Sequence, residues 1–123
     1  MTERGRLLVH LTSGVENPTR AALALLVAAT AAREGHQVDV FIAGDGVSLL
    51  RPSTIAATVG IGTGSLAEHL DALHVAGAGL WASGQSSAAR GILADDLSAV
   101  GFTASPPSKL VELAMTVDQV LTY

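Results

Sequence analysis

Three short apolar runs of the sequence are each followed by small and polar residues that could bind a ligand. The runs cover residues 7–11, 37–43 and 80–82. Hydroxyl and amide groups donate and accept hydrogen bonds, and an arginine binds anions. The candidate binding residues are Thr12, Ser13, Asn17, Asp45, Ser83, Gln85, Ser86 and Arg90. This set favours a small polar or anionic ligand over an apolar one.

The histidines do not form a metal-binding pattern. His69 and His74 are five positions apart, so they do not share one helix face as an i, i+4 pair would. A zinc site needs a third protein ligand, and none is spaced to supply it. His10 lies within an apolar run and is expected to be a hydrogen-bonded core residue. We therefore predict no metal site and no cofactor.

Two glycine-rich segments resemble nucleotide-binding motifs but lack their context. Residues 77–82 fit the pattern G-x-G-x-x-A, yet they lie between a predicted helix and the next strand. The dinucleotide motif instead follows a strand and opens a helix. Gly60, Gly62 and Gly64 lack the Gly-Lys-Ser/Thr of a phosphate-binding loop. Neither segment predicts a nucleotide site.

Ser83 is the candidate nucleophile, but its surroundings do not predict one. An active serine needs a base held beside it, and nothing in the sequence places His10 or His74 there. Ala82-Ser83-Gly84 also lacks the preceding glycine of a nucleophile elbow. We assign no catalytic residue, and the sequence favours a role that is not enzymatic.

The composition is typical of a folded chain, and it excludes any chemistry that needs a thiol group. The 123 residues are 49% hydrophobic and 15% charged, which is typical of one folded domain over residues 1–123. The absence of cysteine excludes disulfides, thiolate metal sites and cysteine nucleophiles. The net charge is −4 and the basic residues are scattered, so we expect no nucleic-acid partner.

The mean hydropathy of +0.45 is high for a soluble monomer of this size, and a membrane or a subunit interface could explain it. A membrane-spanning helix needs about 20 apolar residues. The longest apolar stretch, residues 21–32, is shorter and is interrupted by Thr30. The apolar run at 7–9 is too short for a signal peptide. We expect a cytoplasmic protein whose excess apolar surface is buried between subunits.

Strand and helix signals alternate along the chain. Predicted strands cover residues 7–11, 37–43, 80–82, 102–103 and 119–123. Predicted helices cover 17–33, 65–77 and 105–117, with shorter helical segments at 46–50, 55–59, 87–90 and 94–98 and a flexible loop at 60–64. Asn17 before Pro18 is a typical helix start, and Ser65 with Glu68 forms a capping box.

This alternation predicts a three-layer α/β/α sandwich around a mostly parallel sheet of about five strands. The carboxyl ends of parallel strands meet at one edge of a sheet, beside the amino ends of the helices that follow. The candidate binding residues are therefore expected around one pocket. Arg90 is expected either to reach this pocket or to pair with Asp95 or Asp96.

The chain resembles the DsrE/DsrF-like family of small α/β proteins, which includes the YchN-like proteins. The segments that carry the resemblance are 9–14, 17–21, 34–42, 44–47, 66–77 and 80–92. They occur in the family's order and cover most of the chain. The resemblance implies a homotrimer, or a hexamer made as a dimer of trimers. In the family's sulfur-relay members, a cysteine at the end of the third main strand accepts sulfane sulfur as a persulfide and passes it on.

Counting back from Arg90-Gly91-Ile92, the position of that cysteine falls on Ser83. A serine hydroxyl forms no stable persulfide equivalent, so cysteine-persulfide sulfur transfer by this chain is excluded. Two hypotheses stay open. The chain is a non-catalytic oligomeric subunit that binds a small ligand or regulates a partner. Alternatively, it is an accessory subunit or enzyme of a sulfur-relay (sulfurtransferase) system, with sulfur-relay proteins as partners and the chemistry on a partner or a bound ligand.

Overall fold

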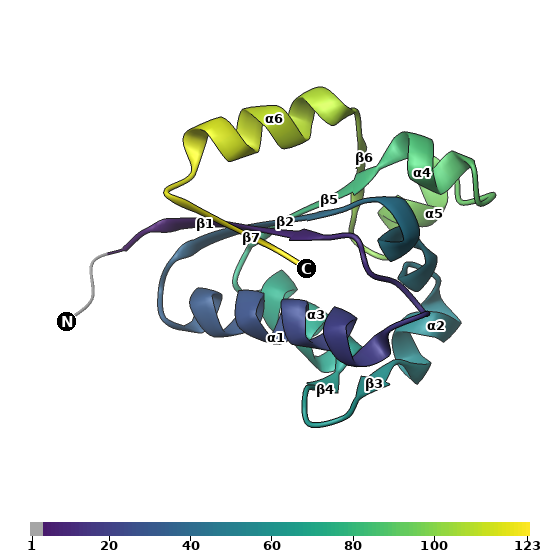
Figure 1. The fold of residues 1–123 in the computed structure, drawn as a ribbon, viewed down its shortest axis with the longest axis horizontal. Coiled ribbons are helices and arrows are strands. Elements are labelled where there is room, and N and C mark those ends of the chain that lie inside the picture. Colours follow the sequence, from purple (N-terminus) through teal and green to yellow (C-terminus); the bar gives the residue numbers. More distant parts are fainter. Residues whose placement is uncertain (1–3) are drawn as a thin grey trace.

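The computed structural model describes residues 4–123, which form a sheet with helices on both faces (Figure 1). The strands are β1 (Arg6–Leu11), β2 (Gln37–Ile42), β3 (Val59–Gly60), β4 (Gly64–Ser65), β5 (Gly79–Ser83), β6 (Thr103–Ser105) and β7 (Gln119–Thr122). The helices are α1 (Pro18–Arg33), α2 (Pro52–Ala57), α3 (Leu66–Val75), α4 (Gly84–Ala88), α5 (Ala94–Ala99) and α6 (Pro107–Thr116), with a 3₁₀ helix η1 (Gly44–Leu49). No helix in residues 4–123 has the length and apolar character needed to cross a membrane.

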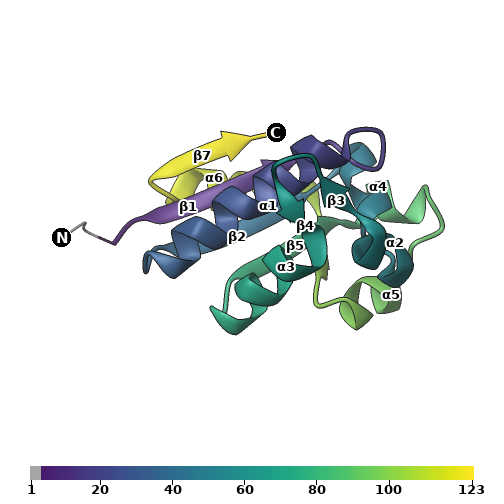
Figure 2. The same ribbon diagram turned by 90° about the horizontal axis from the view of Figure 1, so that it is seen from below.

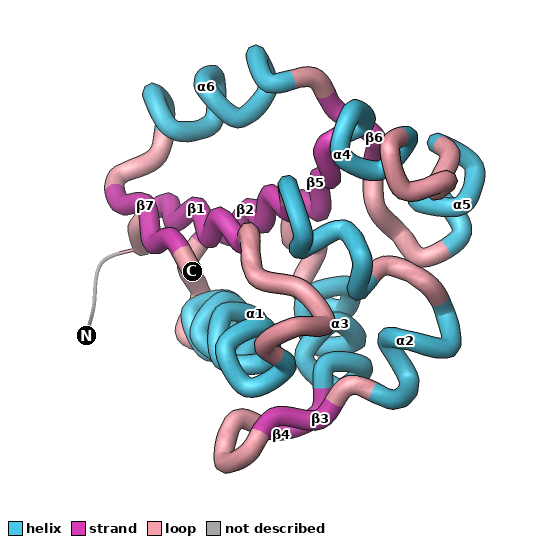
Figure 3. Tube along the Cα trace, turned by 45° about the vertical axis from the view of Figure 1, so that its right-hand side comes forward, coloured by secondary structure: helices cyan, strands magenta, loops and turns pink. Residues whose placement is uncertain are grey.

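The main sheet has five strands in the order β6-β5-β2-β1-β7, and each neighbouring pair is parallel. Figure 3 shows the three layers, with α6 above the sheet and α1 and α3 below it. The predicted fold class is therefore confirmed. The strand order places β2 next to β5, which brings the segments after these two strands together.

The face of the sheet that carries α1 and α3 holds most of the core. Val9, Val40 and Leu80 point from neighbouring strands into one buried cluster. The inner side of α1 is mostly alanine, so its backbone lies close to the sheet, and Leu25 is fully buried there. Figure 2 shows α3 beside α1 across this face, and the two helices are in contact.

The opposite face carries a much smaller core under α6. Leu8, Phe41 and Leu113 are its buried residues, and Leu113 is the one buried residue of α6. Partly buried Ala43, Trp81, Leu110 and Val117 pack around them. This helix is therefore held on the sheet by few side chains.

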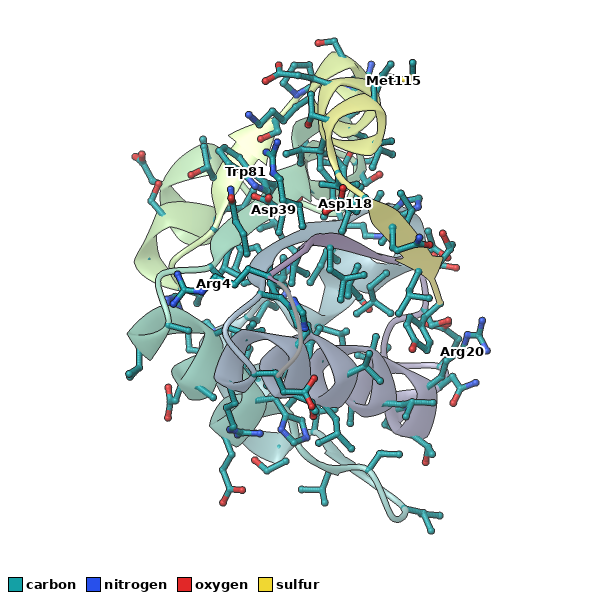
Figure 4. The ribbon with its side chains drawn as sticks, turned by 90° about the vertical axis from the view of Figure 1, so that its left-hand side faces the viewer. Arg4, Arg20, Asp39, Trp81, Met115 and Asp118 are labelled. Atoms are coloured by element: carbon teal, nitrogen blue, oxygen red, sulfur yellow. The ribbon has the colours of Figure 1, made fainter. Side chains whose placement is uncertain are left out.

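A polar cluster reinforces the contact of α6 with the sheet. The indole Nε1 of Trp81 donates to Oδ1 of the buried Asp39 at 2.9 Å, and Nζ of Lys109 lies 4.2 Å from the centre of the indole ring. Figure 4 shows Trp81 and Asp39 beneath α6. A side chain at Gly79 would collide with the Asp39 carboxylate, so glycine is required there. The glycine of the apparent dinucleotide motif thus has a packing role.

The predicted flexible loop at 60–64 is wrong, because this segment is a small antiparallel hairpin of β3 and β4. Its tip is fixed to the start of α1. The hydroxyl of Thr19 accepts a bond from the amide of Ile61 at 3.1 Å, and the hydroxyl of Thr63 donates to the carbonyl of Thr19 at 3.0 Å. Gly62 adopts a φ of 73°, which glycine allows at little cost.

Several helix boundaries also differ from the predicted ones. Helix α2 begins at Pro52, before the predicted start at residue 55, because a proline at the first helical position loses no useful donor. Helix α4 begins at Gly84, directly after β5, since Ser83 serves as its cap. The last helix begins at Pro107, because Ser105 is the final residue of β6. Asn17 caps α1 as expected.

Candidate functional site

Two serines connect the carboxyl ends of β5 and β2. Oγ of Ser83, the last residue of β5, accepts the amide of Ser86 at 3.1 Å and so caps α4. Oγ of Ser86 accepts the amide of Gly44 at 3.0 Å, directly after β2. In both bonds the serine oxygen is the acceptor, so neither hydroxyl proton is used in them.

Arg90 brings a positive charge to the same edge. Its guanidinium lies 2.8 Å from Oδ1 of Asp45 and also donates to the carbonyl of Ser86 at 2.9 Å. The pairing with Asp95 or Asp96, one of the two alternatives for Arg90, does not form: Asp96 instead accepts the amide of Leu93 at 2.8 Å as a cap of α5. We name Asp45, Ser83, Ser86 and Arg90 the serine–arginine cluster.

The loop after β1 lies against this cluster. A side chain at Gly14 would collide with the carbonyl of Asp45, so the two backbones are in close contact. Oγ of Ser48 donates to the same carbonyl at 2.7 Å and accepts the amide of Val15 at 3.2 Å. The loops after β1, β2 and β5 therefore meet at one edge of the sheet, as the parallel topology predicts.

The other candidate residues are placed differently. Thr12 Oγ1 donates to the carbonyl of Tyr123 at 3.0 Å, which directs it toward β7 and away from β5. Oδ1 of Asn17 is occupied as the cap of α1, where it accepts the amide of Arg20 at 3.1 Å. Ser13 is half-buried and Gln85 is exposed. The structure thus brings four of the predicted site residues into one bonded cluster and leaves Thr12, Ser13, Asn17 and Gln85 outside it.

Sequence reasoning missed two residues that shape the cluster. Ser48 connects the β1 loop to Asp45, and the guanidinium of Arg51 donates to the carbonyl of Arg90 at 2.9 Å. Ser48 stands three positions after Asp45, which is the spacing of one 3₁₀ turn. That spacing could have identified Ser48, whereas the contact of Arg51 with Arg90 has no local signal.

His10 has an unusual environment on the α6 face. It lies edge-on to Phe41, with ring centres 6.2 Å apart. Its Nε2 is buried and has no hydrogen-bond partner in the described part of the chain, so the predicted hydrogen-bonded core role is wrong. Burial lowers the pKa of His10 below its ordinary value of 6.5, because the charged imidazolium is poorly solvated there.

The described residues contain no group of three or more histidines and carboxylates close enough to hold a metal ion. The chemistry of the edge is therefore that of hydroxyls, amides, one carboxylate and one guanidinium. Those groups can hold a small polar molecule or an anion in place.

An open groove of about 480 Å³ lies elsewhere, where Ile55, Leu70, Asp71, His74 and Val100 line the space beside α3.

The fold is shared with two solved structures. The YchN protein from E. coli superposes with a TM-score of 0.73 at 16% identity, covering 98% of this chain and 100% of that chain. BT1422, a conserved protein of unknown function from Bacteroides thetaiotaomicron, gives a TM-score of 0.72 at 13% identity, covering 97% of this chain and 95% of that chain. At these identities the likeness establishes the fold alone.

Comparison with curated protein sequences gives no match. A sequence model of the DsrE/DsrF-like family, however, matches residues 6–123. That range includes every strand of the main sheet and the whole serine–arginine cluster. The chain therefore belongs to the DsrE/DsrF-like family, as its sequence resemblance implied.

Proposed function

We propose that this chain is a non-catalytic, homo-oligomeric member of its family that binds a small anionic or polar ligand at the serine–arginine cluster. The observation that carries the proposal is the bonded arrangement of Ser83, Ser86 and Arg90 at the ends of β5 and β2. Ser83, Ser86 and Arg90 lie at the start, in the middle and just after the end of α4, and the segment after β2 is bonded to them through Gly44 and Asp45.

The chemistry of these groups favours an anion. Hydrogen bonds from a guanidinium to an anion are about twice as strong as those between neutral groups. The Asp45 carboxylate occupies part of the Arg90 fork, and the side chain of Asp45 is 70% exposed. An anionic ligand would therefore compete with a solvated carboxylate, which holds its partner weakly. Asp45 serves as the counter-ion of Arg90 when no ligand is bound.

Sulfur transfer through a persulfide is not part of the proposal, because the chain contains no cysteine. Ser83 stands where the resemblance implies the sulfur-carrying cysteine. We infer that the family's site is used here for binding rather than for group transfer. The accessory role in a sulfur relay remains the second hypothesis, with the reacting sulfur on a partner.

Ligand binding is tested with inorganic sulfate, phosphate and thiosulfate as probes. Native mass spectrometry of freshly purified protein and thermal unfolding with each anion should show binding, because a ligand of the folded state raises the unfolding temperature. The Arg90→Gln variant should lose most of this shift. Arg33→Gln, at the far end of α1, is the matched control and should keep it. An equal shift in both variants would contradict the proposed site.

Thiol labelling tests the position of Ser83. The unchanged protein should take up no sulfane sulfur from a persulfide donor and should not react with thiol reagents, because it has no cysteine. The Ser83→Cys variant should gain one reactive thiol, since Ser83 is not fully buried. Ser53→Cys, on the exposed side of α2, is the positive control. An unreactive thiol at position 83 beside a reactive one at 53 would show that the edge is closed.

Light scattering tests the homo-oligomer. The high mean hydropathy and the exposed apolar side chains support self-association. We expect a trimer or a hexamer at micromolar concentration. A stable monomer would overturn this part of the proposal without affecting the binding test.

A further inference from the structure

The open groove beside α3 lies between α2, α3 and the end of α5. Figure 2 shows α2 and α5 close together at one end of the molecule, and α2 is in contact with α3. Ile55 of α2, Leu70 of α3 and Val100 after α5 line the groove, and these side chains are buried or half-buried. None of the lining residues belongs to the serine–arginine cluster. The groove thus has an apolar floor of its own, and we name it the α3–α5 groove.

Exposed polar side chains form the rim of this groove. Asp71 and His74 belong to α3, and Ser98 belongs to α5. Asp95 stands one turn before Ser98 and shares its face of the helix. A side chain at Gly101 would collide with the ring of His74, so this ring lies directly against the backbone after α5. The contact holds the two sides of the groove together.

The surroundings of the groove are acidic. All lining residues fall within residues 52–108, which contain four carboxylates and one basic side chain, Arg90. This balance of −3 accounts for most of the net charge of −4. Arg90 is already paired outside the groove, and the ion pairs of residues 4–123 involve neither Asp71 nor Asp95. The rim therefore carries negative charge that no basic side chain of the described residues neutralises.

The ends of two helices add to this negative charge. α3 ends at Val75 and α5 ends at Ala99, so the carboxyl ends of both border the groove. A helix carries partial negative charge at its carboxyl end, which favours a nearby cation. A basic side chain at the rim would meet a carboxylate and a helix end together.

The length of the groove fits a second helix. Its lining residues on α3 run from Ala67 to His74, which is about 10 Å at about 1.5 Å per residue. Two turns of a partner helix cover that distance. Recognition of a helix in a groove uses apolar anchors about one turn apart, which lie on a floor such as this one. An open groove of this shape therefore suits a helical segment.

We propose that the α3–α5 groove binds a basic amphipathic helix of a partner protein. Two apolar side chains of the partner, one turn apart, would pack on the floor. Its lysines or arginines would lie on both flanks and meet Asp71 and Asp95. Charge complementarity selects this occupant, because an acidic segment would be repelled at the rim. The inference does not depend on anion binding at the serine–arginine cluster.

The helices of this chain do not match that occupant. α1 carries Arg20 and Arg33 near its two ends, and α6 carries Lys109, which lies over Trp81. The other described helices contain no lysine or arginine. A second copy thus offers no helix with a cluster of basic residues, and its own net charge of −4 opposes the approach. The argument favours a different protein as the partner.

The first experiment uses a labelled synthetic helix as the probe. It is about 15 residues long, with two leucines one turn apart, lysines on both flanks and alanine elsewhere. Fluorescence anisotropy should show saturable binding to the unchanged protein, and added salt should weaken it because exposed charges are screened. Replacing the lysines by glutamate, or the leucines by glutamine, should weaken binding at least tenfold. Equal binding of the acidic peptide, or no binding of the basic one, would overturn the proposal.

Charge reversal in the protein locates the binding site. Asp71→Lys should weaken binding of the basic peptide at least tenfold, since it places a like charge at the rim. Glu34→Lys, at the exposed end of α1, changes the net charge equally and is the matched control. It should weaken binding less than twofold. Equal losses in the two variants would show attraction to the net charge alone and would overturn the site.

Two further measurements separate the floor and the assembly from the rim. Ile55→Ser should weaken binding at least fivefold, because it removes apolar contact area, and far-UV circular dichroism checks its fold. The leucine-to-glutamine peptide tests the same contact in the unchanged protein if this variant does not fold. Light scattering should give Asp71→Lys the same mass as the unchanged protein. A lower mass would assign the groove to contacts between copies and overturn the partner helix.

Discussion

The two faces of the sheet differ in how they are covered. The face under α1 and α3 is mainly aliphatic, with Val9, Val40 and Leu25 in one continuous cluster. The face under α6 combines a small apolar cluster with the polar contacts of Asp39, Trp81 and Lys109. The comparison teaches that the two faces are held by different interactions. The α1 face holds most of the apolar core, and the α6 face is held by fewer apolar side chains together with polar contacts.

The largest expected effect is on the α1 face. Leu25→Ala should lower the free energy of unfolding by about 3 kcal/mol, since it leaves a cavity in a fully buried site. Urea unfolding followed by far-UV circular dichroism measures this. Val75→Ala, at an exposed position, should change the value by less than about 0.5 kcal/mol. A similar loss in both variants would contradict a dominant α1 core.

A smaller loss is expected on the α6 face. Leu113→Ala should lower the free energy of unfolding by about 2 kcal/mol, at the low end for a buried leucine, because few side chains surround it. Trp81 is the one tryptophan of the chain, so its fluorescence reports this face. In the variant it should change at lower urea than the circular dichroism. Coincident transitions would show that the two faces unfold as one unit.

The contact between Lys109 and Trp81 is expected to contribute less to the free energy of unfolding than the packing of Leu113 does. Lys109→Met keeps the aliphatic stem but removes the charge above the indole, and should cost about 0.5–1 kcal/mol. Lys109→Arg keeps a cation over the ring and is the matched control. Fluorescence of Trp81 should shift in the methionine variant and change little in the arginine variant. An equal response of both would assign the effect to packing rather than to charge.

The smallest expected effect is a pH dependence from His10. Burial lowers its folded-state pKa, so the unfolded chain binds the proton more readily. Stability from neutral His10 is complete above the unfolded value of about 6.5 and is lost as the pH falls through the folded value. His10→Gln should flatten the decline of unfolding free energy below pH 6.5. The same slope in the unchanged protein and the variant would show that His10 does not titrate with folding.

Most of the fold could be predicted because its signals are local. The apolar runs that became β1 and β2, the Asn17 cap and the glycine after α1 each act within a few residues. The hairpin of β3 and β4 could not be predicted, since its strands are two residues long and Thr19 fixes its tip from 42 positions away. The local sequence pattern favours a flexible loop in this segment, but the tertiary contacts with Thr19 fix it as a hairpin.

Part of the candidate site could also be predicted from the sequence, and part could not. Parallel topology places the segments after β2 and β5 at one edge, and so groups Asp45 with Ser83. The partner of Arg90 was not predictable, because Asp45 is 45 positions away while Asp95 and Asp96 are close in sequence. Nor does the pattern show that the Thr12 hydroxyl bonds to Tyr123, which requires β7 to lie beside β1.

The pairing of β7 with β1 has a kinetic consequence. Thr12 and Tyr123 are 111 positions apart, and the crossover through α6 passes over the full width of the sheet. Contacts this distant in sequence form late, because a long loop must close before they are made. During synthesis the outer edge of β1 therefore stays open until residues 119–123 emerge. In that interval a neighbouring nascent chain can donate its own β7, so slow closure and domain exchange are expected from one feature of the topology.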